Sequence, residues 1–105
     1  MYRPPAFVNQ AAFLAEVTRV CDRLGPDVVE VITDLGHDWT GEPAVFFMVI
    51  LADSATSKDR LFTTAKKVTE AIERELEPME RWDVFAYFNF RSKSEQDKLN
   101  NLTAA

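Results

Sequence analysis

Cysteine, histidine and glycine are scarce in this sequence, with one, one and three residues respectively. The lone Cys21 cannot form a disulfide within the chain, whereas small secreted domains usually carry several, so we expect a cytoplasmic protein. One cysteine and one histidine also exclude a zinc site of the usual kind. Three glycines, all in predicted loops or helix caps, leave no glycine-rich phosphate-binding loop. We therefore expect no metal and no cofactor.

Long apolar runs are absent as well. The longest, from Ala44 to Ala52, has nine residues, which is too short to span a bilayer. The first residues, Met-Tyr-Arg-Pro-Pro-Ala-Phe, contain no apolar run of signal-peptide length. Both observations favour a cytoplasmic protein without membrane contact.

What is present is the composition of an ordinary globular domain. Of the 105 residues, 47% are hydrophobic and 28% are charged, which is enough apolar material for a core without disulfides. The length favours one domain over residues 1–105. Within it, we expect residues 1–8 to form an N-terminal arm and residues 103–105 a frayed tail.

The negative charge is concentrated in one segment. Residues 27–43 carry five acids and no lysine or arginine, and so account for the whole net charge of −5. These acids are Asp27, Glu30, Asp34, Asp38 and Glu42. A local acidic field favours a basic protein partner and disfavours nucleic acid or an anionic membrane. The alternative is that the acids only solvate one edge of a hairpin.

The first predicted helix follows the N-terminal arm, where Pro4 and Pro5 prevent a helix start. Asn9 is its expected N-cap, and apolar residues then recur three and four apart up to Leu24. Cys21 lies on this apolar stripe, which is typical of a small buried hydrophobic residue rather than a catalytic thiol. Gly25 followed by proline ends the helix.

Two further helices are expected. Ser57 is the expected N-cap of a long helix, whose apolar stripe runs from Leu61 to Leu76 and which ends at Pro78. Ser92 and Glu95 have capping-box spacing before a short helix that reaches about Leu102, and Ser94 is an alternative cap.

Three strands complete the pattern. Val28–Leu35 is rich in β-branched residues and predicts an antiparallel edge strand, with Val29 on the face of Val31 and Val28 on the opposite face. Ala44–Ala52 has no polar alternation, so it predicts a central strand that is buried on both faces. Trp82–Phe90 alternates in character and predicts a third strand.

The element order α-β-β-α-β-α predicts an α/β (α+β) two-layer sandwich, in which helices cover one face of a three-stranded sheet. The other face then carries surplus apolar residues from the central strand. They are either Val45, Phe47, Val49 and Leu51 or Phe46, Met48 and Ile50. Residues of the third strand join them, either Phe85 and Tyr87 or Trp82, Val84, Ala86, Phe88 and Phe90. A large apolar patch usually marks an interface. The expected covers are the C-terminal helix, a second copy of the chain or a partner protein.

The loop between the first two strands supplies the candidate site. Trp39 stands between two glycines in an acidic loop, where it either anchors a partner or folds back over the sheet edge. We predict partner-binding residues in this loop and on the open sheet face, namely Asp34, His37, Asp38, Trp39, Glu42, Phe85 and Tyr87. A small enzyme with Asp34, His37 and Asp38 as its acid–base group is the alternative.

The element order also resembles the type II KH-like fold of ribosome-binding factor A. The similarity covers the first helix, the hairpin of Val28–Leu35 with Ala44–Ala52, the Leu61–Leu76 helix and the Trp82–Phe90 strand. It implies a KH-like RNA-binding domain. KH domains grip phosphates at a glycine-rich kink, and no glycine follows Gly41 in this sequence.

Two short segments resemble short uncharacterised bacterial proteins of toxin–antitoxin or defence modules. They are Gly41-Glu-Pro-Ala-Val-Phe-Phe47 and Tyr87-Phe-Asn-Phe-Arg-Ser-Lys-Ser-Glu-Gln96. This resemblance implies an intracellular, antitoxin-like or accessory protein that neutralises or supports a larger neighbour. Our leading expectation is accordingly a non-enzymatic interaction module that binds a basic protein, a second copy of itself, or both.

Overall fold

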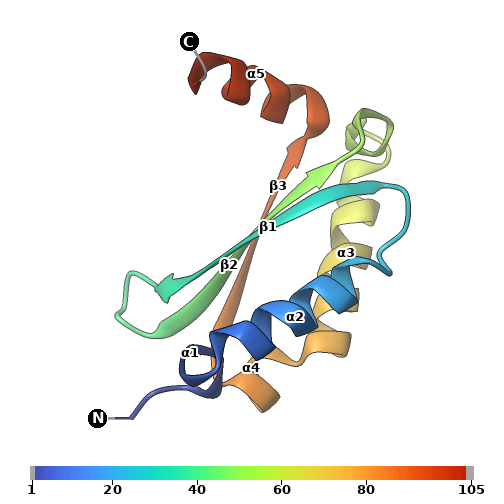
Figure 1. The fold of residues 1–105 in the computed structure, drawn as a ribbon. Coiled ribbons are helices and arrows are strands. Elements are labelled where there is room, and N and C mark those ends of the chain that lie inside the picture. Colours follow the sequence, from blue (N-terminus) through green and yellow to red (C-terminus); the bar gives the residue numbers. More distant parts are fainter. Residues whose placement is uncertain (1, 104–105) are drawn as a thin grey trace.

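The computed structural model describes residues 2–103 and has the predicted α+β architecture (Figure 1). A three-stranded sheet carries helices on one face, in the predicted order of main elements. The main elements are α2 (Gln10–Cys21), β1 (Val28–His37), β2 (Pro43–Leu51), α3 (Leu61–Leu76), β3 (Phe85–Ser92) and α5 (Lys93–Thr103). Three short helices join them, namely α1 (Pro5–Val8), η1 (Asp53–Thr56) and α4 (Pro78–Trp82).

The sheet has the order β1-β2-β3. β1 and β2 form an antiparallel hairpin, and β3 returns through α3 to pair parallel with β2. The predictions of an edge position for the first strand and a central position for the second are therefore confirmed. As the central strand, β2 is paired along both edges; its inward residues are buried in the core, whereas Phe46 and Met48 on the other side stay partly exposed.

The core lies between the sheet and the pair α2 and α3, which sit on the same side of it in Figure 1. Alternate residues of β2 point into this layer and are at most 1% exposed. They meet the apolar stripes of the two helices. The core includes Val45, Phe47, Val49 and Leu51 from β2, Phe13, Val17 and Val20 from α2, and Val68, Ile72 and Leu76 from α3.

Two helix caps were predicted correctly. The Asn9 side chain accepts a hydrogen bond of 3.2 Å from the Ala12 amide at the start of α2. At the start of α5, Ser92 Oγ accepts from the Glu95 amide at 3.1 Å and donates to the Glu95 carboxylate at 3.2 Å. The first bond is the side-chain cap that the capping-box spacing predicted, whereas the Glu95 carboxylate accepts from the Ser92 hydroxyl and not from the Ser92 amide.

The cap predicted for the long helix was wrong. Ser57 lies in a turn before α3, and its carbonyl oxygen, rather than its side chain, accepts from the amides of Arg60 and Leu61. The helix begins at Leu61 without a side-chain cap. The N-terminal arm also differs from the prediction, because Pro5 starts the one-turn helix α1. Proline fits the first turn of a helix, since the amide it lacks has no partner there.

The faces of β1 differ from the prediction at its start. Val28 pairs with Leu51 and Glu30 pairs with Ile50, so Val29 is the extra residue of a bulge. The bulge turns Val28 toward the core and leaves Val29 48% exposed, the reverse of the predicted assignment.

The third strand begins later than predicted. Trp82 belongs to α4, which lies between two residues with left-handed backbone, Glu77 (φ 49°) and Asp83 (φ 54°). β3 starts at Phe85 and extends to Ser92. No helix within residues 2–103 combines the length and the apolar character needed to cross a membrane.

Candidate functional site

The candidate site is the sheet face opposite α2 and α3, which we call the open face. Register places three residues side by side in each of its rows. The rows are Gly36–Ala44–Phe85, Asp34–Phe46–Tyr87, Ile32–Met48–Asn89 and Glu30–Ile50–Arg91. Of the two apolar sets left open by the sequence, Phe46, Met48 and Ile50 therefore face away from the core, together with Phe85 and Tyr87.

α5 covers only one end of the open face. Figure 1 shows this helix beyond the end of the sheet and away from α2 and α3. It contacts β2 and β3 there, and Ile50 in the last row is fully buried. Toward the other end, Ile32 is 40% exposed and Phe85 is 44% exposed. Trp39 packs on Tyr87 and Phe85 shares a pocket with Tyr2 and Met79, and the apolar surface between them stays partly open.

Three aromatic rings form a continuous group on the uncovered part. Phe46 stacks on Tyr87 with ring centroids 5.4 Å apart, and Trp39 leans on Tyr87 at 5.3 Å. The Phe46 ring lies above Gly36, where an added Cβ would come within 3.9 Å of it. Trp39 remains 81% exposed despite its contact with Tyr87. Trp39 therefore combines features of both predicted alternatives. It folds back onto Tyr87 of the sheet, yet most of its ring stays exposed and could anchor a partner.

Asp38 holds the loop that carries Trp39. Its Oδ1 accepts from the Thr40 amide (2.9 Å), the Thr40 hydroxyl (2.6 Å) and the Glu42 amide (3.0 Å). Its Oδ2 accepts from the Tyr87 hydroxyl at 2.7 Å. These bonds, the Thr40 hydroxyl foremost, lower the pKa of Asp38 to about 2. Asp38 is therefore ionised at neutral pH and fixes the loop rather than offering a free carboxylate.

The other acids form a rim along β1 and the loop. Glu30 and Asp34 belong to the open face, and Glu42 ends the loop. None of the three makes a hydrogen bond or ion pair through its carboxylate within residues 2–103. The basic residue of the open face, Arg91, lies on the opposite edge and donates to Gln96 of α5 at 2.6 Å. The acidic rim is therefore available to a basic ligand.

The structure does not bring the predicted acid–base group together. His37 points to the helix side of the sheet, where its ring meets Phe7 of α1 edge-on at 5.5 Å. Asp34 lies on the open face. The Asp38 carboxylate is engaged by the loop and by Tyr87. Of the seven predicted partner-binding residues, His37 is thus the one that lies on the wrong face for a shared site.

Sequence reasoning missed one contact that builds the site. The bond between Tyr87 and Asp38 joins residues 49 positions apart, and no local pattern predicts it. Alternation in β3 was the available signal, because it placed Tyr87 on the same face as Phe85.

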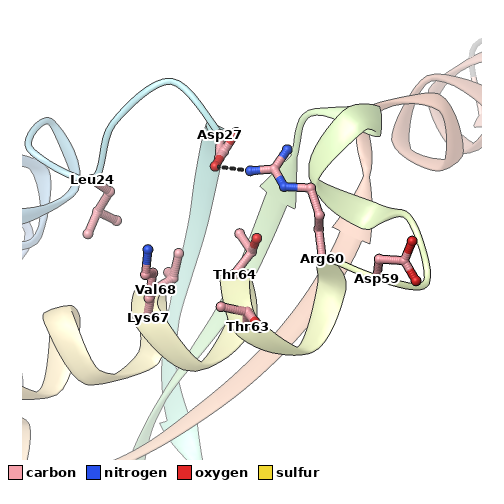
Figure 2. Close-up of a pocket in the computed structure, with 8 residues that line it drawn as sticks. All are labelled: Leu24, Asp27, Asp59, Arg60, Thr63, Thr64, Lys67 and Val68. Carbon is pink, nitrogen blue, oxygen red and sulfur yellow. Dashed lines mark hydrogen bonds and ion pairs between the residues drawn. The ribbon is translucent and has the colours of Figure 1, made fainter.

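A polar pocket lies on the helix side (Figure 2). It measures about 270 Å³ and is lined by Leu24, Asp27, Asp59, Arg60, Thr63, Thr64, Lys67 and Val68. Its two acids and two bases cancel, and Arg60 is already paired with Asp27 at 3.0 Å. This pocket therefore lacks the net charge that would select an ionic ligand.

Within residues 2–103 there is no group of three or more His, Cys, Asp or Glu residues that is placed to hold a metal ion. Comparison with protein-family models, with curated proteins and with solved structures finds no match to this chain.

Proposed function

We propose that this chain is a non-catalytic interaction module that binds a basic partner protein through the open face. The observation that carries the proposal is the exposure of Trp39, which is held in place by Tyr87 and the Asp38 loop yet remains 81% exposed. A large aromatic side chain in a fixed orientation loses little conformational entropy on binding, which is why such residues anchor interfaces.

The acids at the open face favour a basic partner. Asp34 lies in the same row as Phe46 and Tyr87, and Glu42 ends the loop that carries Trp39, whereas Glu30 lies farther along β1, near Lys93. This acidic rim steers lysine and arginine side chains toward the face and raises the association rate. Arginine also stacks on exposed rings through cation–π contacts, for which Trp39 is the best acceptor.

The arrangement of residues on the open face favours one form of partner segment. The uncovered part of the face carries apolar residues along β2 and acids along β1. An amphipathic helix with apolar residues on one side and bases beside them matches this layout. Occupation of a basic surface is the action expected of an antitoxin-like or accessory protein that neutralises or supports a larger neighbour.

The proposal can be tested with two synthetic peptides of identical apolar pattern, one with lysine and one with glutamate at the polar positions. We expect the lysine peptide to shift the NMR signals of Trp39, Phe46 and Tyr87 in the isotope-labelled chain. Trp39→Ala should weaken binding by about tenfold or more, since anchor residues contribute more than about 1.4 kcal/mol.

Phe62→Ala is the matched control, because Phe62 of α3 is 79% exposed but lies on the helix side. This variant should bind the lysine peptide as the parent chain does. Equal binding of the two peptides, or shifts confined to α2 and α3, would contradict the proposal. Capture from cell extract with the parent chain and Trp39→Ala as paired baits would then identify the natural partner.

RNA is the second candidate, and the same aromatic group favours it. Bases stack on exposed aromatic side chains of an open sheet, and Tyr87 and Phe46 are adjacent on two strands. Against this, a phosphate backbone on the face would meet Glu30 and Asp34. A labelled single-stranded RNA, titrated at low salt, separates the two candidates, because only an RNA-binding protein would give salt-sensitive binding that Trp39→Ala abolishes.

A further inference from the structure

The two edges of the sheet differ in how they are protected. A free strand edge presents unpaired amide and carbonyl groups, and proteins usually blunt it with charges, proline or a bulge. β1 has such devices, namely Glu30, Asp34 and the bulge at Val29. β3 reads Phe-Ala-Tyr-Phe-Asn-Phe-Arg-Ser, without proline, lysine or carboxylate. Its one charge, Arg91, is bonded to Gln96. The edge of β3 is thus left open to another strand.

The helices α2 and α3 also cover β3 less completely than they cover β2. The inward residues of β2 are at most 1% exposed, whereas their neighbours Ala86, Phe88 and Phe90 on β3 remain partly exposed. A groove of about 420 Å³ runs between β3 and α3 at this edge, lined by Lys58, Leu61, Phe62, Ala65 and Phe90. Phe62 projects from it and is 79% exposed. The edge is therefore incomplete in both its hydrogen bonds and its apolar cover.

Charge favours a second copy of the chain as the occupant. Glu30 and Asp34 lie on β1, at the far edge of the sheet, so two copies that meet along β3 keep these acids apart. On the same flank of α3, helical spacing aligns Phe62 with Lys66 near its start and Glu73 near its end. Two such helices in antiparallel orientation bring lysine of one copy toward glutamate of the other.

We propose that two copies of this chain pair antiparallel along β3 and form a six-stranded sheet about a twofold axis. Each Phe62 then packs beside the β3 edge of the other copy and closes the groove. A twofold axis makes the contact isologous, so the assembly closes at two copies and leaves β1 as the protected outer edge. The two open faces become one surface with Phe85 and Tyr87 of both copies near its middle. This dimer does not depend on the proposed function.

The first test is the mass of the full-length chain in solution, measured by light scattering over a dilution series. We expect a dimer that dissociates on dilution. Phe62→Asp should raise the dissociation constant by about tenfold or more, because it places a charge in the apolar contact. Trp39→Ala is the matched control, since it removes an equally exposed aromatic residue from the other face and should leave the dimer intact.

Folding and location are checked separately. Phe62→Asp should unfold at the same temperature as the parent chain at concentrations where both are monomeric, because the Phe62 side chain is exposed. A spin label at position 89, in the middle of β3, should report a short distance between copies when Cys21 is replaced by serine. A label at position 34 on β1 should report a longer one, because five strand spacings of about 4.8 Å separate the outer strands.

Several results would overturn the proposal. A chain that stays monomeric at all concentrations would do so, as would a dimer that Phe62→Asp leaves unchanged. Growth into fibres instead of a closed dimer would exclude the twofold contact. A monomer that captures an extended peptide at β3, with loss of binding in Phe62→Asp, would replace the second copy with a partner strand. The peptide test of the open face is unaffected by each of these results.

Discussion

The Tyr87 hydroxyl donates a hydrogen bond of 2.7 Å to Asp38 Oδ2 and so ties β3 to the hairpin loop of β1 and β2. Together with the Thr40 and Glu42 bonds, this hydrogen bond helps to fix the loop that carries Trp39 and to lower the pKa of Asp38. Tyr87→Phe keeps the ring and removes this donor. We expect the pKa of Asp38 to rise from about 2 toward its ordinary value, and the NMR signals of Trp39 to broaden or shift.

A carboxyl NMR titration of both forms measures this change. Thr40→Val is the companion variant, because the Thr40 hydroxyl is the largest cause of the lowered pKa. It should raise the pKa of Asp38 at least as much as Tyr87→Phe does. An unchanged Asp38 titration in both variants would mean that these bonds do not form in solution.

Stability should fall in acid for a related reason. Hydrogen bonds from Ser94 lower the pKa of Asp53, and those from Arg19 lower the pKa of Glu16, as the Thr40 hydroxyl lowers that of Asp38. A carboxyl whose pKa is lower in the folded state stabilises it above the unfolded pKa, and this contribution is lost as the pH falls through the folded pKa. We therefore expect the free energy of unfolding to drop between about pH 4 and pH 2.

Urea unfolding at a series of pH values checks this prediction. Asp38→Asn should flatten part of the acid slope, because it removes one of the three linked groups. Asp59→Asn is the control, since it removes an exposed carboxylate that accepts no hydrogen bond within residues 2–103. A free energy of unfolding that is constant between about pH 5 and pH 2 would contradict the linkage.

The main elements could be predicted from the sequence because their signals are local. Asn9 and the pair of Ser92 and Glu95 mark helix starts through side chains that bond within three residues. The apolar run of β2 predicted a central strand because a strand without polar alternation is typical of the middle of a sheet, although Phe46 and Met48 on one face stay partly exposed. These signals do not depend on the rest of the fold.

The sequence-based predictions were wrong or incomplete where contacts between distant residues or an unusual backbone conformation determine the structure. The alternation of Trp82 and Val84 with Ala86 favoured a strand from Trp82. Trp82 instead ends the short helix α4, which the left-handed residues Glu77 and Asp83 flank, while Val84 is still buried at 1% exposure. The choice between the two apolar sets of β2 could not be predicted either, because it depends on which side α2 and α3 pack.

Cys21 should be nearly inert toward alkylation. It lies on α2 against the core, and its burial, followed by the charge of Asp22, raises the pKa of the thiol to about 11. Since only the thiolate reacts, folded protein at about pH 8 should react with iodoacetamide roughly a hundredfold more slowly than an ordinary cysteine. The same chain unfolded in urea is the control and should react at the ordinary rate. Fast labelling of the folded chain would instead indicate an accessible, activated thiol.

Phe46 and Phe47 give the sharpest test of which face is the core. They are adjacent in β2 and point to opposite sides of the sheet. Phe47 is 1% exposed and stacks on Phe88, so Phe47→Ala should cost about 3–5 kcal/mol of unfolding free energy through lost burial and a cavity. Phe46 is only partly buried, and Phe46→Ala should cost about 1 kcal/mol, mainly from its stacking on Tyr87.

Urea unfolding of the two variants, compared at equal slope against denaturant, measures the difference. In the peptide-binding experiment we expect the reverse order, with the larger effect from the Phe46 variant. Phe46→Ala should weaken binding of the lysine peptide, whereas Phe47→Ala should leave binding unchanged wherever that variant is folded. The reversed order of stabilities would mean that α2 and α3 pack on the other face, and the face of Phe46 could not then be the partner site.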